Sequence, residues 1–153
     1  MDRIDRNILA CLQTDATLSV AEIAERVGLS TTPCWRRIQN LEKSGVVRAR
    51  VALLDPQKLN VGVTVFVRLK TGRHDYDWLE DFARKVADMD EVVEFYRMSG
   101  DIDYLLRIVV PDIGSYDAVY KRLIRAAAFS DVSSSFALEE IKYTTALPLN
   151  YVR

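Results

Sequence analysis

The sequence predicts an α+β fold with two domains: helices alone at the N-terminus, and a β-α-β-β-α-β order in the remainder. Two observations predict it. In the first 42 residues apolar positions recur every three or four residues, as on the buried stripe of a helix. In residues 61–70 an apolar residue occupies nearly every second position, as in a strand. We therefore expect a helical domain at 1–50, a linker at 51–60 and a second domain at 61–153.

Composition indicates a soluble globular protein of the cytoplasm. Apolar residues make up 49% of the chain, which is enough to form a core. No run approaches the ~18 apolar residues that a membrane helix needs. The N-terminus is charged from Asp2 onward, which argues against a signal peptide. Contact with a membrane is therefore not expected.

Charge is unevenly distributed, although the net charge is only −1. Residues 1–50 carry eight Lys or Arg against six Asp or Glu, whereas residues 51–153 carry thirteen against sixteen. The basic excess lies between Arg36 and Arg50, where only Glu42 opposes it. Such a patch attracts phosphate. The alternative is an ordinary basic face in water.

The first two helices are bounded by recognisable signals. Residues 2–14 carry an apolar stripe made of Ile4, Ile8, Leu9 and Leu12. Ser19 and, three residues later, Glu22 form a capping box that begins the second helix. The stripe of that helix comprises Val20, Ile23, Ala24 and Val27. Gly28 ends it, because a left-handed residue without a Cβ is favoured there.

The third helix completes a predicted helix-turn-helix, in which two helices cross around a tight turn. It is expected to begin at Ser30 or Thr32, with Pro33 near its first position, where a missing N–H costs nothing. Its buried stripe comprises Cys34, Ile38 and Leu41. The polar residues expected to project away from that stripe are Arg36, Arg37, Gln39 and Asn40. Such side chains read base edges and hold phosphate.

The predicted DNA-contacting set extends into the segment after this helix. Residues 46–51 favour a strand, which would form a wing that carries Arg48 and Arg50 toward the DNA backbone. The expected DNA-binding residues are Ser30, Thr31, Thr32, Trp35, Arg36, Arg37, Gln39, Asn40, Arg48 and Arg50. For Trp35, packing at the helix edge is an equal alternative.

The second domain is expected to be ferredoxin-like, an antiparallel sheet with both helices on one face. Ser99-Gly100-Asp101 indicates a hairpin turn, and Asp112 can cap the last helix. The expected elements are a strand at 61–70, a helix around 79–86, strands at 92–98 and 102–110, a helix at 113–127 and a strand at 132–141.

The sheet face opposite these helices is also apolar, at Phe66, Leu105, Val109 and Ala137. We expect a second copy of the chain to cover it across a two-fold axis. The alternative is scattered exposed apolar residues, which are common. In a dimer the two recognition helices, one from each chain, would contact successive major grooves of double-stranded DNA. The operator would therefore be a pseudo-palindrome.

The cysteines and the histidine predict no metal and no other cofactor. Cys11 and Cys34 lie far apart on inward stripes, which favours buried reduced thiols. His74 is the only histidine, so zinc would lack its usual ligands.

In these features the chain resembles the Lrp/AsnC family, the leucine-responsive and asparagine-linked transcriptional regulators of bacteria and archaea. The resemblance spans nearly the whole chain. It rests on Ile-Asp-Arg-Asn-Ile-Leu at 4–9, Gly-Leu-Ser-Thr-Thr-Pro-Cys at 28–34 with Arg37, Ala-Leu-Leu-Asp-Pro at 52–56 and Ser-Gly-Asp-Ile-Asp-Tyr-Leu-Leu at 99–106. It implies that the second domain binds an amino acid, that dimers assemble into octamers or larger discs, and that DNA bends around them.

The resemblance also implies a ligand site between dimers, around the turn at 99–104. Backbone N–H groups beside Gly100 can receive a carboxylate, and Asp101 or Asp103 can hold an ammonium group. Without the resemblance, a plain hairpin turn would be favoured. The expected ligand-binding residues are Met98, Ser99, Gly100, Asp101, Asp103, Tyr104, Ser133, Ser135 and Thr145.

The tail at 133–148 is similar to branches of the family that answer cysteine and to others linked to branched-chain amino acids, and we favour cysteine. Two other functions remain open at this stage. One is an enzyme like the sirohaem decarboxylases on the same fold, which suits a chain with a single histidine poorly. The other is a ligand-binding module without DNA, which would require the Arg36–Arg37 face to be buried.

Overall fold

The computed structural model describes residues 1–72 and 75–152, and these form two compact units. The N-terminal unit comprises Met1–Leu53 together with Lys142–Arg153, and the C-terminal unit comprises Leu54–Ile141. The first unit thus ends inside the predicted linker. The end of the chain, which we assigned to the second domain, is part of the first. His74 lies outside the described residues.

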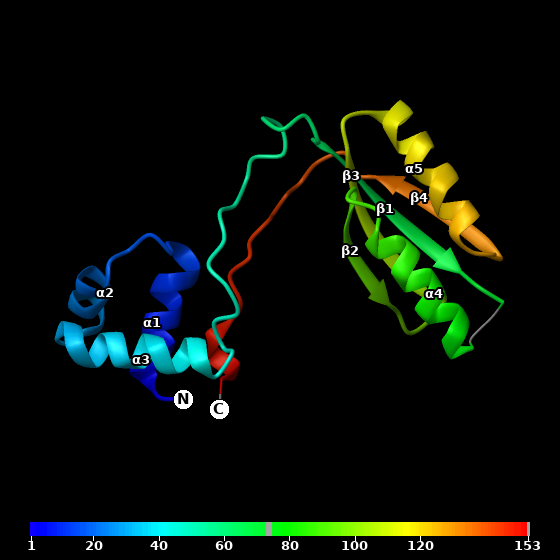
Figure 1. Cartoon of the computed structure of the whole chain (residues 1–153). Coiled ribbons are helices and arrows are strands. Elements are labelled where there is room, and N and C mark those ends of the chain that lie inside the picture. The colour runs from blue at the N-terminus through cyan, green and yellow to red at the C-terminus, as the bar shows by residue number, and fades with distance from the viewer. Residues whose placement is uncertain (73–74, 153) are drawn as a thin grey trace. The chain divides into compact units, whose positions relative to one another are not determined.

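Three helices build the N-terminal unit: α1 (Arg3–Thr14), α2 (Val20–Val27) and α3 (Thr31–Lys43), as Figure 1 shows. Capping boxes begin the first two. The predicted box of Ser19 and Glu22 is confirmed, and Asp2 forms a second one with Asp5. The buried core comprises Ile8, Leu9, Leu12, Ile23, Ala24, Cys34, Ile38 and Leu41. All three predicted apolar stripes therefore meet in one core.

The turn between α2 and α3 follows the predicted chemistry. Gly28 has a φ of +70°, and the N–H of Leu29 donates to the carbonyl of Ala24 over 2.9 Å. The N–H of Gly28 donates to the same carbonyl, so Ala24 accepts two backbone bonds that close the end of α2. Any side chain at Gly28 would be strained at this φ, so glycine sets the direction in which α3 leaves.

The C-terminal residues complete the N-terminal unit. The side-chain amide of Gln13 on α1 makes two bonds to the backbone of Leu147: its Nε2 donates to the carbonyl over 3.1 Å, and its Oε1 accepts from the N–H over 3.0 Å. The short 3-10 helix η1 (Leu149–Tyr151) follows, and Leu149 packs against the helical core. Figure 1 shows this last turn in red beside the N-terminal helices.

The C-terminal unit has the predicted order β-α-β-β-α-β. Its elements are β1 (Val63–Lys70), α4 (Tyr76–Ala87), β2 (Val92–Arg97), β3 (Tyr104–Val110), α5 (Ile113–Ala126) and β4 (Asp131–Phe136). The strands form one antiparallel sheet in the order β2-β3-β1-β4, and α4 and α5 cover the same face (Figure 1).

Strand β4 is shorter than the predicted strand at 132–141. The N–H of Ala137 still donates to Thr64 over 2.9 Å. Beyond it the chain has passed the start of β1 at Val63, so residues 138–141 find no partner strand there.

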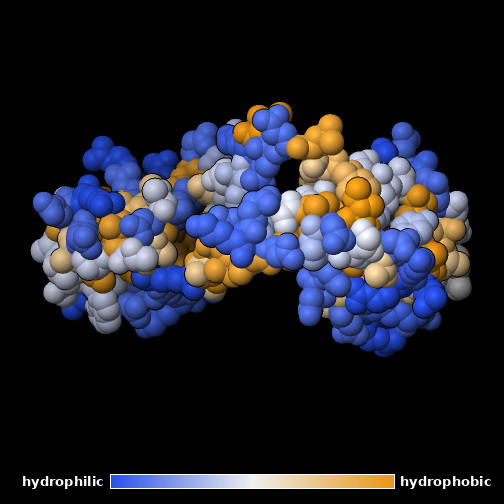
Figure 2. Space-filling model, turned by 90° about the horizontal axis from the view of Figure 1, so that it is seen from above, coloured by the Kyte–Doolittle hydropathy of each residue, from blue (hydrophilic) through white to orange (hydrophobic). Residues whose placement is uncertain are grey.

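The two faces of the sheet differ in burial. The helix-covered face holds a core that includes Val65, Val67, Leu106 and Ile108, each 0% exposed. On the opposite face Phe66 is 37% exposed. Seen from above in Figure 2, the surface shows apolar side chains scattered among polar ones. In the part of the chain that the structure describes, no helix combines the length and apolar content needed to cross a bilayer.

Candidate nucleic-acid interface and ligand loop

The outward face of α3 presents polar groups to solvent. Arg36 and Asn40 are exposed and lie one turn apart, on the side opposite the buried stripe of Cys34, Ile38 and Leu41. Arg36 makes no ion pair with any described residue. Its five N–H donors are therefore available to a base edge or a phosphate.

The start of α3 adds hydroxyl groups to this face. Ser30 occupies the N-cap position, but its side chain makes no capping bond. Thr31 and Thr32 are exposed in the first turn, where free backbone N–H groups favour an anion such as phosphate. Trp35 is 50% exposed, so its ring is available at the edge of the helix.

Glu42 binds two side chains that are predicted to contact DNA. The Nε2 of Gln39 donates to Glu42 over 3.0 Å, and the guanidinium of Arg50 pairs with the other oxygen of Glu42 at 2.8 Å. Gln39 is half-buried. Each bond occupies one nitrogen of the side chain, so Gln39 and Arg50 would have to turn from Glu42 to bring that nitrogen to DNA.

Arg37 does not project to solvent as expected. Its Nη1 donates to the carboxylates of Asp2 and Asp5 on α1, over 2.7 Å each. These bonds raise the pKa of Arg37, and the pKa of Asp2 is lowered, first by the N–H of Asp5 and then by Arg37. The sequence contained the signal: Arg37 follows Cys34 by three residues and precedes Leu41 by four, so it borders the buried face.

The predicted wing is also absent as a strand. Residues 46–51 form no strand in the structure, because no other segment pairs with them. Val47 instead packs against the helical core, and its N–H donates to Leu41 over 3.1 Å. Arg48 is exposed beside it, without a strand to hold it.

The two cysteines have different environments. Cys34 is 0% exposed in the core, whereas Cys11 is partly exposed. Burial raises the pKa of the Cys34 thiol above its ordinary 9.0, and the nearby Cys11 thiol adds to the effect. Among the described residues, no group of three or more His, Cys, Asp or Glu side chains could hold a metal ion.

We expect iodoacetamide at pH 8 to alkylate Cys11 well before Cys34, because burial keeps Cys34 protonated and out of reach. Mass spectrometry of peptides over time measures both rates, and in denaturant the two should react alike. Equal rates in the native protein would contradict the burial of Cys34. The stability that the raised pKa contributes is complete below pH 9.0 and is lost as pH rises through the folded-state value.

The turn after β2 leaves several backbone donors exposed. Gly100 has a φ of +108°, and Ser99, Gly100 and Asp101 are exposed. The backbone N–H groups of these three residues donate to no other described residue. Three free donors in succession can receive an anion.

Two other predicted ligand residues have structural roles instead. Oδ2 of Asp103 accepts the N–H of Thr71 over 2.7 Å, and so ties the end of β1 to this hairpin. Tyr104 is 3% exposed and packs against Trp78, Phe82 and Phe95. Alternation explains the burial, because Tyr104 begins β3 on the helix-covered face.

The remaining predicted ligand residues are dispersed. Met98 is 38% exposed beside the turn. Ser133 on β4 accepts from Arg68 over 3.0 Å on the uncovered sheet face, which Ser135 shares. Thr145 belongs to the tail that packs with the N-terminal unit.

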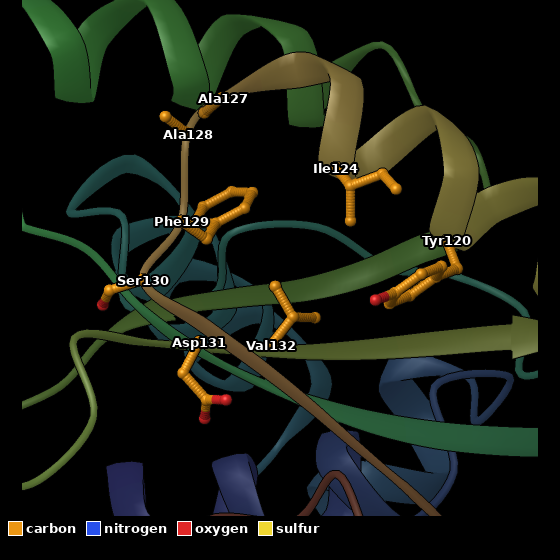
Figure 3. A pocket seen from close by; sticks show the side chains of 8 residues that line it. All are labelled: Tyr120, Ile124, Ala127, Ala128, Phe129, Ser130, Asp131 and Val132. Carbon is orange, nitrogen blue, oxygen red and sulfur yellow. The ribbon is translucent and has the colours of Figure 1, made fainter.

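A hollow of about 520 Å³ lies between α5 and β4, at residues to which the sequence assigned no ligand-binding role. Figure 3 shows the side chains of Tyr120, Ile124, Phe129 and Val132 turned toward it, and that of Asp131 turned away. None of the predicted ligand residues lines it. No pattern in the sequence distinguishes its lining residues, because they also fit a helix and an edge strand.

These features define a class of protein: a helix-turn-helix unit joined to a ferredoxin-like unit. Comparison with known proteins agrees with this two-unit architecture. Residues 1–48 match the family described as winged helix-turn-helix DNA-binding, and residues 64–147 match the Lrp/AsnC ligand binding domain. The DNA-binding transcriptional activator DecR of Escherichia coli is 51% identical over 97% of this chain and 99% of its own length.

Solved structures share the fold over the full length. An AsnC family transcriptional regulator from Agrobacterium tumefaciens is 63% identical with a TM-score of 0.97, and the match covers 100% of both chains. The transcriptional regulator NMB0573 from Neisseria meningitidis, solved in complex with L-Met, is 40% identical with a TM-score of 0.94, covering 100% of this chain and 99% of that one. The chain belongs to the Lrp/AsnC family. It is a DNA-binding transcriptional regulator with a ligand-binding domain, and not an enzyme.

Proposed function

We propose that this regulator binds a pseudo-palindromic operator as a homodimer or an assembly of dimers, and that an amino acid changes its operator occupancy. The observation that carries the proposal is the free polar face of α3, with Arg36 and Asn40 exposed one turn apart. We also propose that the protein acts in the cytoplasm, because the proposed operator and amino-acid effector would be found there.

The proposed DNA contacts divide into two kinds. Arg36 and Asn40 would contact base edges in the major groove, and Trp35 would lie beside them. Ser30, Thr31 and Thr32 at the start of α3 and the exposed Arg48 would hold phosphate. Gln39 and Arg50 would contribute after leaving Glu42.

The proposed dimer forms through the uncovered face of the sheet. Phe66, Leu105 and Val109 lie on that face, and Phe66 is 37% exposed in the single chain. An apolar face of this kind is favoured as the interface with a second copy, because two identical faces can bury each other across a two-fold axis.

The proposed effector is an α-amino acid bound at the turn of 98–101. The free N–H groups beside Gly100 would receive its carboxylate, and the exposed Asp101 would hold its ammonium group. The L-Met complex of the relative from Neisseria meningitidis supports this class of ligand. Cysteine is the favoured effector and a branched-chain amino acid the next, on the similarity of the tail at 133–148.

A screen followed by a binding assay tests this function. Thermal shift with each of the twenty amino acids identifies ligands that stabilise the folded protein. Duplexes selected from a randomised library by the protein then serve as operator in fluorescence anisotropy, with and without each ligand. Equal affinity for selected and random duplexes would refute the DNA-binding proposal, and operator affinity that no amino acid changes would refute the effector.

We expect Arg36→Ala to weaken operator binding by on the order of 1–3 kcal/mol per contact, because a forked bond to a base is lost. Anisotropy titrations against operator and random duplexes measure the effect. Arg84→Ala, which removes an exposed arginine from α4 of the C-terminal unit, is the matched control. Equal weakening on every duplex would make Arg36 a phosphate contact instead.

A further inference from the structure

We propose that Arg37 is a positioning residue of the DNA-reading helix and not a DNA contact: held by Asp2 and Asp5, it fixes α3 against the start of α1. The proposal rests on the proposed function, since operator binding is its readout. It assigns a role to a side chain that periodicity alone would place among the base readers.

The four carboxylate oxygens of Asp2 and Asp5 form one closed network. Asp2 accepts the N–H of Asp5 through Oδ1 over 2.8 Å, and Asp5 accepts the N–H of Asp2 through Oδ2 over 3.2 Å. The two remaining oxygens both accept Nη1 of Arg37 over 2.7 Å. The cap of α1 and the clamp on α3 therefore share the same two carboxylates, and neither carboxylate can turn without breaking a capping bond.

The charge around Arg37 opposes a contact with DNA. One guanidinium lies between two carboxylates, so the cluster is net negative and repels phosphate. Both short charge-assisted bonds come from Nη1, so a base or phosphate that drew the guanidinium away from α1 would have to break them. Arg36 is the opposite case, because no described residue offers it a carboxylate.

The clamp lies beside a surface hollow, outside the core that α1 and α3 share. A hollow of about 510 Å³ opens here, lined by Met1, Asp5, Arg37, Asn40, Leu41, Ser44 and Val46. The shared core holds α1 and α3 together through Ile8, Leu9 and Leu12 of α1, and the two ion pairs add a polar connection at the start of α1. Asn40 also lines this hollow, so a shift of α3 would move a proposed base contact.

The sign of the effect of Asp5→Asn on operator binding tests the proposal. A positioning role predicts that Asp5→Asn and Arg37→Ala each weaken binding to a selected duplex by about tenfold, because base contacts need close placement. The double variant should bind no worse than the weaker single, because both lose the same clamp. Binding to random duplexes and the slope of affinity against salt should change little.

The opposite outcomes would overturn it. If Asp5→Asn strengthens operator binding, the carboxylates hold Arg37 back from DNA, and Arg37 itself contacts the operator. If Arg37→Ala alone weakens binding and lowers the salt slope by about one, Arg37 touches phosphate. Unchanged operator affinity in both variants would show that the clamp positions nothing.

Controls distinguish these outcomes from a general effect of charge and from unfolding of a variant. Glu25→Gln removes one negative charge from an exposed residue of α2, so it corrects for the general attraction that Asp5→Asn adds. Far-UV circular dichroism must show that each variant is folded at the assay temperature. If Asp5→Asn is not folded, Asp2→Asn takes its place, because Asp2 is the other carboxylate that Arg37 binds. A wild-type chain that binds all duplexes equally would refute the proposed function, whereas wild-type discrimination with inert clamp variants would refute only the clamp.

Discussion

Replacing Phe82 by alanine is expected to lower the free energy of unfolding of the C-terminal unit by about 3–5 kcal/mol. Phe82 is 0% exposed, and its ring is the centre of an aromatic cluster. The ring centroids of Trp78, Phe95, Tyr104 and Phe129 lie 5.3, 5.3, 5.7 and 5.2 Å from it. Alanine leaves a cavity that α4, α5 and the sheet cannot close without moving together.

Urea denaturation followed by near-UV circular dichroism measures this loss, because the signal reports the packed aromatic rings. Ile113→Ala is the matched control: Ile113 is 69% exposed on α5, so its change should stay within about 0.5 kcal/mol. A loss below about 1 kcal/mol for Phe82→Ala would contradict a close-packed cluster. The N-terminal unit should keep its own unfolding transition, because Phe82 belongs to the other compact unit.

Phe66→Lys is expected to weaken the proposed dimer by roughly 3–5 kcal/mol, about a hundred- to several-thousandfold in its dissociation constant. The lysine would bring an unpaired charge into the interface from both copies. Arg107 stands opposite Phe66 in β3 and is itself paired with Glu94 at 2.7 Å, so the new ammonium group gains no carboxylate. Operator affinity should fall with the dimer, since each chain then binds one half-site alone.

Sedimentation across a range of protein concentrations measures the dissociation constant. Ile113→Lys introduces the same charge at an exposed apolar residue on the helix-covered side, and should leave the association unchanged. An unaltered oligomeric state in Phe66→Lys would show that a different surface holds the copies together.

Local signals in the sequence predict most of the fold. The capping box of Ser19 and Glu22 and the left-handed Gly28 act over a few residues, so both were recognisable in the sequence and both occur. The alternation in 61–70 likewise predicts which side chains of β1 are buried. These features depend on backbone geometry, which neighbouring residues determine.

The errors have a common physical origin in contacts between distant residues. Arg37 turns inward because Asp2 and Asp5, more than thirty positions earlier, offer it carboxylates. Residues 46–51 have strand propensity but no partner strand, and propensity without a partner does not make a strand. The tail joins the first unit through Gln13, which lies 134 positions from Leu147. No local pattern encodes such a pairing.

The return of the chain end to the N-terminal helices has a consequence for biosynthesis. Leu147 is synthesised 134 positions after Gln13, so Gln13 and the helical core can bind Leu147 and Leu149 only after the whole C-terminal unit has been translated. A polypeptide truncated before residue 142 would carry the three helices without the segment that packs on them.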